Sequence, residues 1–261
     1  MKLGISTAAL YPLETEKALE FLGQNGVPVT EIFFNSHCEL EEEFIELLNG
    51  IRLKYNIEIN SLHACGSVGE PYYLFSEYER RYSETRKFYK KYYRAAKTLG
   101  AKMLVLHGDS LHGHISFAKY AERLKEMNED ARQYGVWVVH ENVNRFRLAT
   151  PENVRVMRKL CGDVLKFTFD IKQAVRAGVD PYEMLDAMSG GIVNVHISDN
   201  KDGADCLLPG QGNFDFEKFF KTLRQMNYNG ACLIEVYRNC YGKPDELIDA
   251  YKNVKQFPFL C

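Results

Sequence analysis

The sequence predicts a single (β/α)8 barrel that spans residues 1–261. Short apolar segments recur eight times along the chain, and longer amphipathic segments separate them. The length of 261 residues suits one such barrel, which typically needs about 250 residues. A doubly wound sheet also alternates strands and helices but rarely uses eight such units, so it is the alternative fold.

The eight predicted strands are apolar on both sides. One-sided antiparallel strands would alternate with polar residues, so this pattern favours parallel strands buried beneath outer helices. The segments are residues 3–6, 31–34, 57–63, 102–107, 136–141, 165–170, 192–198 and 232–236.

The intervening segments have the signals of helices. Apolar residues recur at helical spacing in 14–24 and 41–55, and the longest helix is expected over 77–99. Thr150 and Asp180 each precede a proline, the combination expected of an N-cap followed by the first helical residue.

Composition narrows the classes of function. Lys plus Arg is 33 and Asp plus Glu is 35, so a net charge of −2 does not favour a nucleic-acid partner. No apolar run approaches the roughly 18 residues of a membrane span. The seven cysteines are scattered without a C-x-x-C pair, which indicates a reduced, cytoplasmic protein.

Polar residues lie where successive predicted strands end. The carboxyl ends of barrel strands form the mouth, where catalytic groups gather, so we expect these side chains to meet there. They are His63, His107, Glu141, Asp170, His196 and Glu235.

Carboxylates embedded in apolar strands need a cationic partner, because burying an unpaired charge is costly. Glu141, Asp170 and Glu235 with the imidazole of His196 would form an oxygen-rich site for one divalent metal ion. Such a donor set favours Mn²⁺, with Zn²⁺, Co²⁺ and Mg²⁺ as alternatives. The competing interpretation is a purely structural polar network.

Five short motifs resemble those of the xylose isomerase-like TIM barrels, in particular the sugar (phosphate) isomerase/epimerase branch. The resemblance covers nearly the whole chain, and the motifs occur in the same order at corresponding strands. They are HEN (140–142), FDIKQA (169–174), VHISDN (195–200), LPGQGNFDF (208–216) and LIEVY (233–237).

The resemblance implies that Glu141, Asp170, His196 and Glu235 bind the metal and that the two glutamates also act as acid and base. It implies proton transfer next to the carbonyl of a small carbohydrate, through an enediolate. Return of the proton to the opposite face gives an epimer, and its return to the adjacent carbon gives an aldose–ketose isomer.

The chain departs from the family pattern at Gln173 and Cys206, where many members have histidine. The apurinic-site endonucleases of this superfamily use such histidines for additional zinc ions. We therefore expect one metal ion, although a cysteine can bind zinc and His63 and His107 are retained. An endonuclease-like zinc phosphodiesterase, an inosose-type dehydratase and a non-catalytic sugar-binding barrel are the alternative functions.

Further residues are expected at the substrate. We expect substrate contacts from His63, His107, Lys172, Gln173 and Tyr73, whereas His140 should face the helices, opposite to Glu141.

Two larger features surround the expected mouth. The aromatic segment 66–82, with Tyr72, Tyr73 and Phe75, is expected to close over the sugar or to contact a second subunit. In a homo-oligomer, the apolar segment 257–261 would also lie in the contact. Several loop cations make an anionic group on the substrate plausible: Arg145, Arg147, Lys172, Lys201 and Arg238.

Overall fold

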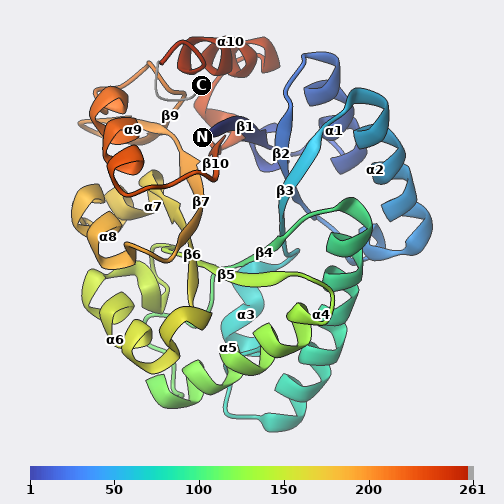
Figure 1. Ribbon diagram of the computed structural model, residues 1–261, viewed down its shortest axis with the longest axis vertical. Coiled ribbons are helices and arrows are strands. Elements are labelled where there is room, and N and C mark those ends of the chain that lie inside the picture. Colours follow the sequence, from blue (N-terminus) through green and yellow to red (C-terminus); the bar gives the residue numbers. More distant parts are fainter. Residues whose placement is uncertain (258–261) are drawn as a thin grey trace.

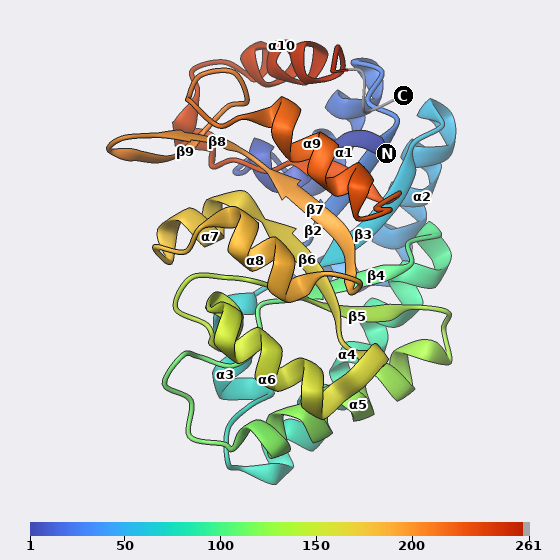
Figure 2. The ribbon, with the colours of Figure 1, turned by 60° about the vertical axis from the view of Figure 1, so that its left-hand side comes forward.

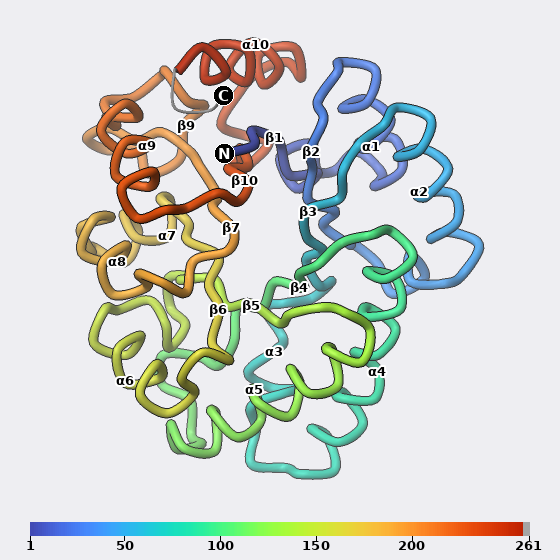
Figure 3. The backbone as a smooth tube through the Cα atoms, viewed as in Figure 1, coloured from blue at the N-terminus to red at the C-terminus, as the bar shows by residue number. Residues whose placement is uncertain are grey.

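A closed barrel of eight parallel strands forms the centre of the protein in the computed structural model, which describes residues 1–257 (Figure 1). The chain circles the barrel, and its first and last barrel strands pair, with Lys2 opposite Ala231 (Figure 3). These strands are β1 (Lys2–Ser6), β2 (Val29–Phe33), β3 (Glu58–His63), β4 (Met103–Leu106), β5 (Trp137–Glu141), β6 (Lys166–Asp170), β7 (Ile192–Ile197) and β10 (Ala231–Ile234). The predicted (β/α)8 barrel is confirmed.

Helices surround the strands, as Figure 1 shows. Two of them begin as expected: the Thr150 side chain accepts a hydrogen bond from the Asn153 N–H, and Asp180 accepts from the N–H groups of Tyr182 and Glu183. The helices are α1 (Thr15–Gln24), α2 (Glu42–Tyr55), α3 (Glu70–Tyr73), α4 (Glu79–Leu99), α5 (Phe117–Arg132), α6 (Pro151–Cys161), α7 (Ile171–Arg176), α8 (Pro181–Met188), α9 (Phe216–Gln225) and α10 (Pro244–Val254).

Alternation along the strands decides which side chains enter the barrel. Val29, Ala231 and Leu233 form one small buried cluster, and Met103, Val105 and Val139 form another, apart from the main core. Side chains two residues apart on a strand face the same side. Glu235 therefore follows Leu233 inward and Glu141 follows Val139. The intervening His140 points outward, and its Nε2 lies 3.1 Å from the Tyr120 hydroxyl on α5.

One element was not predicted. After β7 the chain forms an antiparallel hairpin of β8 (Asp199–Lys201) and β9 (Ala204–Leu207), which projects from the barrel in Figure 2. Its turn contains Asp202 and Gly203, and Gly203 has φ +79°, in the left-handed region that glycine readily adopts. An Asp-Gly pair is a hairpin signal, but short polar strands lack the apolar pattern used to find the barrel strands.

The structure also addresses a membrane span and the expected subunit contact at the end of the chain. Within residues 1–257, no helix is both long and apolar enough to cross a membrane. Of the segment 257–261, expected at a subunit contact, residues 258–261 lie outside the described residues. The ring of Phe257 lies 5.7 Å from that of Phe220 on α9.

Candidate metal centre and substrate cavity

The structure brings the four expected metal ligands together inside the mouth of the barrel. One potential ligand atom from each of Glu141, Asp170, His196 and Glu235 lies within 4.8 Å of the others, and all four residues are buried. His196 Nδ1 lies 3.7 Å from Glu141 Oε1, 3.7 Å from Asp170 Oδ2 and 3.3 Å from Glu235 Oε2. The imidazole nitrogen therefore points at all three carboxylates.

Local structure orients Asp170. The residue ends β6 and caps α7, because its Oδ1 accepts a hydrogen bond from the Gln173 N–H at 2.9 Å. Asn142 also holds it, since the Asn142 amide donates to the Asp170 carbonyl and accepts from the Asp170 N–H. The cap uses Oδ1, so Oδ2 is the oxygen left to face His196.

Glu31, a residue not expected at the site, orients His196. Its buried carboxylate lies on β2, 3.2 Å from His196 Nε2, and also accepts a hydrogen bond from Ser61 at 2.7 Å. A proton on Nε2 shared with Glu31 leaves the lone pair of Nδ1 toward the three carboxylates, and Nδ1 has no hydrogen-bond partner within residues 1–257. A histidine held through its other nitrogen by a carboxylate is the common arrangement at metal sites. The donor set and this buried, unpartnered nitrogen fit a divalent ion.

Glu31 could have been recognised from the sequence. It is a charged residue inside an apolar strand segment, the same signal that identified Glu141. Its partner His196 lies 165 residues later, and only the closed barrel brings the two together.

The electrostatics of the cluster favour positive charge. Burial alone would lower the pKa of His196 and of Lys172, but the surrounding carboxylates raise both pKa values well above their ordinary ranges. For Lys172 these are Asp170, Glu235 and Glu141. The carboxylates thus favour the cationic form of each side chain, and a metal ion at His196 Nδ1 would take the place of the second imidazole proton.

A cavity of about 960 Å³ opens above the ligand cluster. Ligand pockets commonly have about 300–1,000 Å³, so a sugar fits this space. Six residues expected at the substrate or as catalysts line it together with aromatic side chains. The lining includes His63, His107, Glu141, Lys172, Gln173, Glu235, Tyr11, Phe33, Tyr237, Arg238 and Tyr241.

His63 and His107 form a second potential ligand group with Glu141. Their Nε2 atoms lie 3.5 and 3.6 Å from Glu141 Oε2. Burial is the main reason that the pKa of His107 is lowered to about 3, so its imidazole is neutral. A neutral His107 can accept a hydrogen bond from a substrate or bind a metal. Burial acts to lower the pKa of His63, but its hydrogen bond to Glu141 and the charges of Glu31, Glu141 and Glu235 raise it above its ordinary value. No described ligand group includes Cys206, a buried residue of β9.

Gln173 and Tyr73 lie differently. Gln173 lines the cavity, and its Oε1 accepts a hydrogen bond from the Asn144 N–H at 3.1 Å. Tyr73 lies on α3 with half of its surface exposed and is not among the residues that line the cavity. Its ring contacts Tyr72, with 5.1 Å between centroids.

Phe75 does not close over the mouth, contrary to expectation. It is 1% exposed and its ring packs 4.7 Å from that of Tyr120. An aromatic side chain gains more by filling the space beneath α5 than by facing solvent, so Phe75 is a core residue.

The five loop cations do not gather in the cavity. Arg147 is buried, and its Nε lies 2.9 Å from Asp109 Oδ2. Lys201 lies on the β8–β9 hairpin, away from the cavity lining. Lys172 and Arg238 do line it, but Lys172 is paired with carboxylates and Arg238 donates to the carbonyls of Tyr241 and Gly242. These cations therefore do not form one cluster in the cavity, because Arg147, Lys172 and Arg238 each pair with groups of the protein itself.

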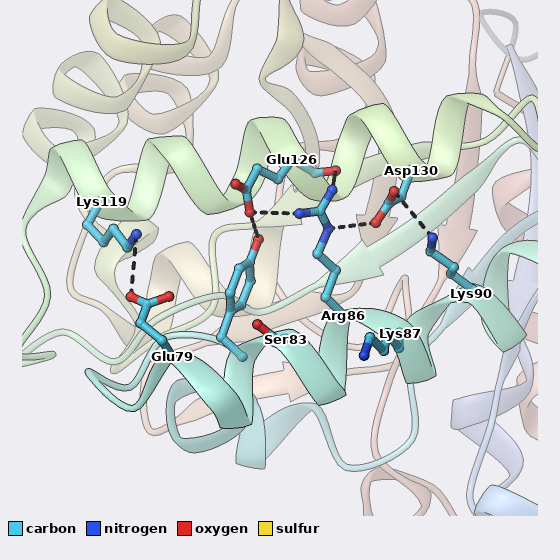
Figure 4. Close-up of a pocket in the computed structure, with 9 residues that line it drawn as sticks. Glu79, Ser83, Arg86, Lys87, Lys90, Lys119, Glu126 and Asp130 are labelled. Atoms are coloured by element: carbon cyan, nitrogen blue, oxygen red, sulfur yellow. Dashed lines mark hydrogen bonds and ion pairs between the residues drawn. The ribbon is translucent and has the colours of Figure 1, made fainter.

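A second concave site lies between α4 and α5, and none of the four expected metal ligands lines it (Figure 4). Its volume is about 350 Å³. Arg86 bonds to Glu126 and Asp130 there, and Lys119 pairs with Glu79, so its acids and bases neutralise one another. This hollow is an ion-paired helix interface rather than a candidate active site.

Glu31→Gln is expected to weaken divalent metal binding by about 10-fold to 100-fold, the usual effect of losing such a supporting carboxylate. The neutral amide no longer stabilises the Nε2–H form of His196. Isothermal titration with Mn²⁺ measures the change. Ser6→Ala is the matched control, because Ser6 also donates to Glu31 but does not contact His196. Equal Kd values for wild type and a folded Glu31→Gln protein would contradict the orienting role.

Glu70 supports the loop that carries His107. Burial raises the pKa of Glu70 to about 8, against the lowering effect of a hydrogen bond of 2.7 Å from the Gly108 N–H. The folded state therefore binds a proton that the unfolded state releases above its ordinary pKa of 4.5. The stability from this proton is complete below pH 4.5 and is lost as the pH rises to about 8.

Glu70→Gln should remove this pH dependence. Between pH 5 and pH 8.5 we expect the wild type to lose about 2–5 kcal/mol more unfolding free energy than the variant. Urea unfolding at both pH values measures the difference, and titrations common to both proteins cancel. Parallel pH profiles would show that Glu70 is ionised in the folded protein.

Comparisons with known proteins agree with this architecture. The sequence model described as "Xylose isomerase-like TIM barrel" matches residues 17–256. An uncharacterized protein of Methanocaldococcus jannaschii is 28% identical over 90% of this chain and 83% of its own. An inosose dehydratase of Clostridium perfringens is 26% identical over 67% of this chain and 71% of its own.

The fold has close counterparts among solved structures. One is the crystal structure of a D-tagatose 3-epimerase-like protein, with a TM-score of 0.81 and 24% identity. The match covers 98% of this chain and 97% of that one, so the two share the whole barrel.

Proposed function

Because the chain belongs to the xylose isomerase-like TIM barrel family, we propose that it is a divalent-metal-dependent epimerase or isomerase of a ketose or related keto-polyol. One observation carries the proposal: two buried glutamates, Glu141 and Glu235, lie with Asp170 around His196 Nδ1 and also line the cavity. The site therefore unites a metal-ligand set with two carboxylates that can reach a bound molecule.

Glu141, Asp170, His196 and Glu235 would hold the ion, which when bound would supply Lewis-acid stabilisation of a substrate oxyanion. One of the two glutamates takes the proton from the carbon next to the substrate carbonyl. The other returns a proton, to the opposite face of that carbon in an epimerase or to the neighbouring carbon in an isomerase. General acid–base help of this kind typically contributes about 10²–10⁴-fold.

Three oxygen donors and one nitrogen suit Mn²⁺, with Zn²⁺, Co²⁺ and Mg²⁺ as alternatives. The cavity supports a small carbohydrate as substrate, with His63, His107, Lys172 and Gln173 as contacts. Tyr73, also expected as a contact, is not among the residues that line the cavity. The similarity to a D-tagatose 3-epimerase-like protein supports a ketose.

Proton exchange tests the function directly. The protein with Mn²⁺ is incubated in D2O with a panel of ketoses and their phosphates, and NMR follows deuterium at the carbons next to the carbonyl. We expect exchange together with the appearance of an epimer or isomer. Ketoses that bind tightly without exchange would leave a non-catalytic sugar-binding barrel as the function.

Two other activities have specific support. The second ligand group around His63 and His107 favours an endonuclease-like zinc phosphodiesterase, and the inosose dehydratase relative favours loss of water from a keto-polyol. Elemental analysis tests the phosphodiesterase, which needs about three zinc ions per chain, whereas the proposed function needs one metal ion. Mass spectrometry separates the second, because dehydration lowers the product mass and epimerisation does not.

A further inference from the structure

Lys172 lies inside the candidate metal site rather than beside it. Its side chain is 2% exposed, and Nζ donates to Asp170 Oδ2 and to Glu235 Oε2, both at 2.8 Å. Hydrogen bonds between ionised groups of this length are among the strong ones in proteins.

The ammonium contacts the same oxygens that a metal would use. Asp170 Oδ1 is engaged in the cap of α7, so Oδ2 is its remaining oxygen. Glu235 Oε2 is the carboxylate oxygen nearest to His196 Nδ1, at 3.3 Å. Lys172 therefore bridges two of the four ligands through their ligating atoms.

We infer that Lys172 is the resident cation of this site, which a divalent ion displaces into the cavity, where the ammonium then faces the substrate. The inference rests on the proposed metal-dependent function. Its basis is competition: two cations that share the same two carboxylate oxygens repel each other, and the divalent ion carries the higher charge.

The cavity offers the displaced ammonium a place. Lys172 lines the cavity, and the Tyr237 ring lies 5.2 Å from Nζ. That ring is held in position, because Arg176 donates to the Tyr237 hydroxyl at 2.7 Å and is itself paired with Asp205 on β9. An ammonium moved toward a fixed aromatic face keeps a favourable contact and can donate to a substrate oxygen.

This arrangement couples the binding of the metal ion to the binding of the substrate. Without a metal, Lys172 neutralises buried carboxylates and is unavailable to the substrate. With a metal, its three donors become available beside Glu235. Metal binding should therefore precede tight substrate binding, and Lys172 should set the metal affinity.

Lys172→Met tests the inference through Mn²⁺ affinity, measured by isothermal titration without substrate. Methionine keeps an unbranched side chain and removes the competing charge. We expect the Kd for Mn²⁺ to fall by at least about tenfold, because the ion no longer has to break two charge-assisted hydrogen bonds. Arg238→Met is the matched control, since it removes a cavity cation that touches none of the ligand oxygens, and its Kd should change by less than about threefold.

The outcomes separate this inference from the proposed function. If the wild type binds Mn²⁺ and Lys172→Met binds it equally or more weakly, the resident-cation role is wrong while the metal-dependent function stands. If neither protein binds a divalent ion, both are overturned. A crystal structure of the Mn²⁺-loaded wild type decides the matter even where the variant does not fold. Displacement is supported if Lys172 Nζ has left Asp170 Oδ2 or Glu235 Oε2 in that structure. It is refuted if Nζ still donates hydrogen bonds to both oxygens.

Discussion

Replacing Glu235 or Glu141 by glutamine is expected to lower kcat by at least about 10³-fold in the epimerisation or isomerisation assay. Glutamine has nearly the same shape, but its amide neither accepts a proton from carbon nor returns one. Both glutamates are buried at the base of the cavity, so bulk water does not readily replace them as the base. Deuterium exchange into the substrate should fall together with turnover.

Both glutamates are also expected metal ligands, so metal content must be measured for each variant by elemental analysis. Activity is then compared at saturating Mn²⁺, which separates proton transfer from metal loss. Glu70→Gln is the matched control, a buried glutamate outside the cavity lining, and it should keep activity within a few fold. A variant of either site glutamate that retains wild-type exchange would show that another group transfers that proton.

Removing the metal is expected to abolish activity and to lower the melting temperature. An ion present at about 100 times its Kd stabilises a folded protein by about 2.7 kcal/mol, which corresponds to roughly 5–10 °C for a chain of this length. Chelation followed by calorimetry measures the shift, and the addition of Mn²⁺ should restore both properties.

The control for chelation is a variant that lacks part of the site. Asp170→Ala removes one ligand oxygen and also the cap of α7, so it should melt at a lower temperature and respond little to chelator or Mn²⁺. A wild-type protein that stays fully active with less than about one tenth of a metal ion per chain would refute metal dependence.

The positions of the candidate ligands follow from two properties that a sequence displays. Strand alternation sends Glu141 inward and His140 outward, and the carboxyl ends of parallel strands must meet at one mouth. The four candidate ligands at the ends of β5, β6, β7 and β10 could therefore be assigned to one site, although Glu141 and Glu235 are 94 residues apart. The same rules predict whether a strand side chain faces into or out of the barrel. They do not predict which other side chain it contacts.

The misjudged residues show this limit. Phe75 and Tyr73 lie in one aromatic segment, yet Phe75 fills the core beside Tyr120 and Tyr73 stays half exposed. Arg147 is a mouth-side cation in the sequence, but Asp109 from the preceding loop neutralises it. Whether a loop residue is buried or paired depends on which other loops lie beside it. The local sequence pattern does not specify those neighbours.

The sequence by itself determined the barrel, the strand order along the chain and the strand-end residues that face the mouth, because period-two alternation and strand ends are local properties. Only the tertiary structure decided that Glu31 holds His196 and that Lys172 bridges Asp170 and Glu235. The contact between Glu31 and His196 and that between Lys172 and Glu235 join segments that are distant in sequence. Lys172 and Asp170 are only two residues apart, but packing decides which way the lysine side chain points. The physical reason is that the energy of a buried charge depends on every neighbour in three dimensions, and closure of the barrel supplies those neighbours.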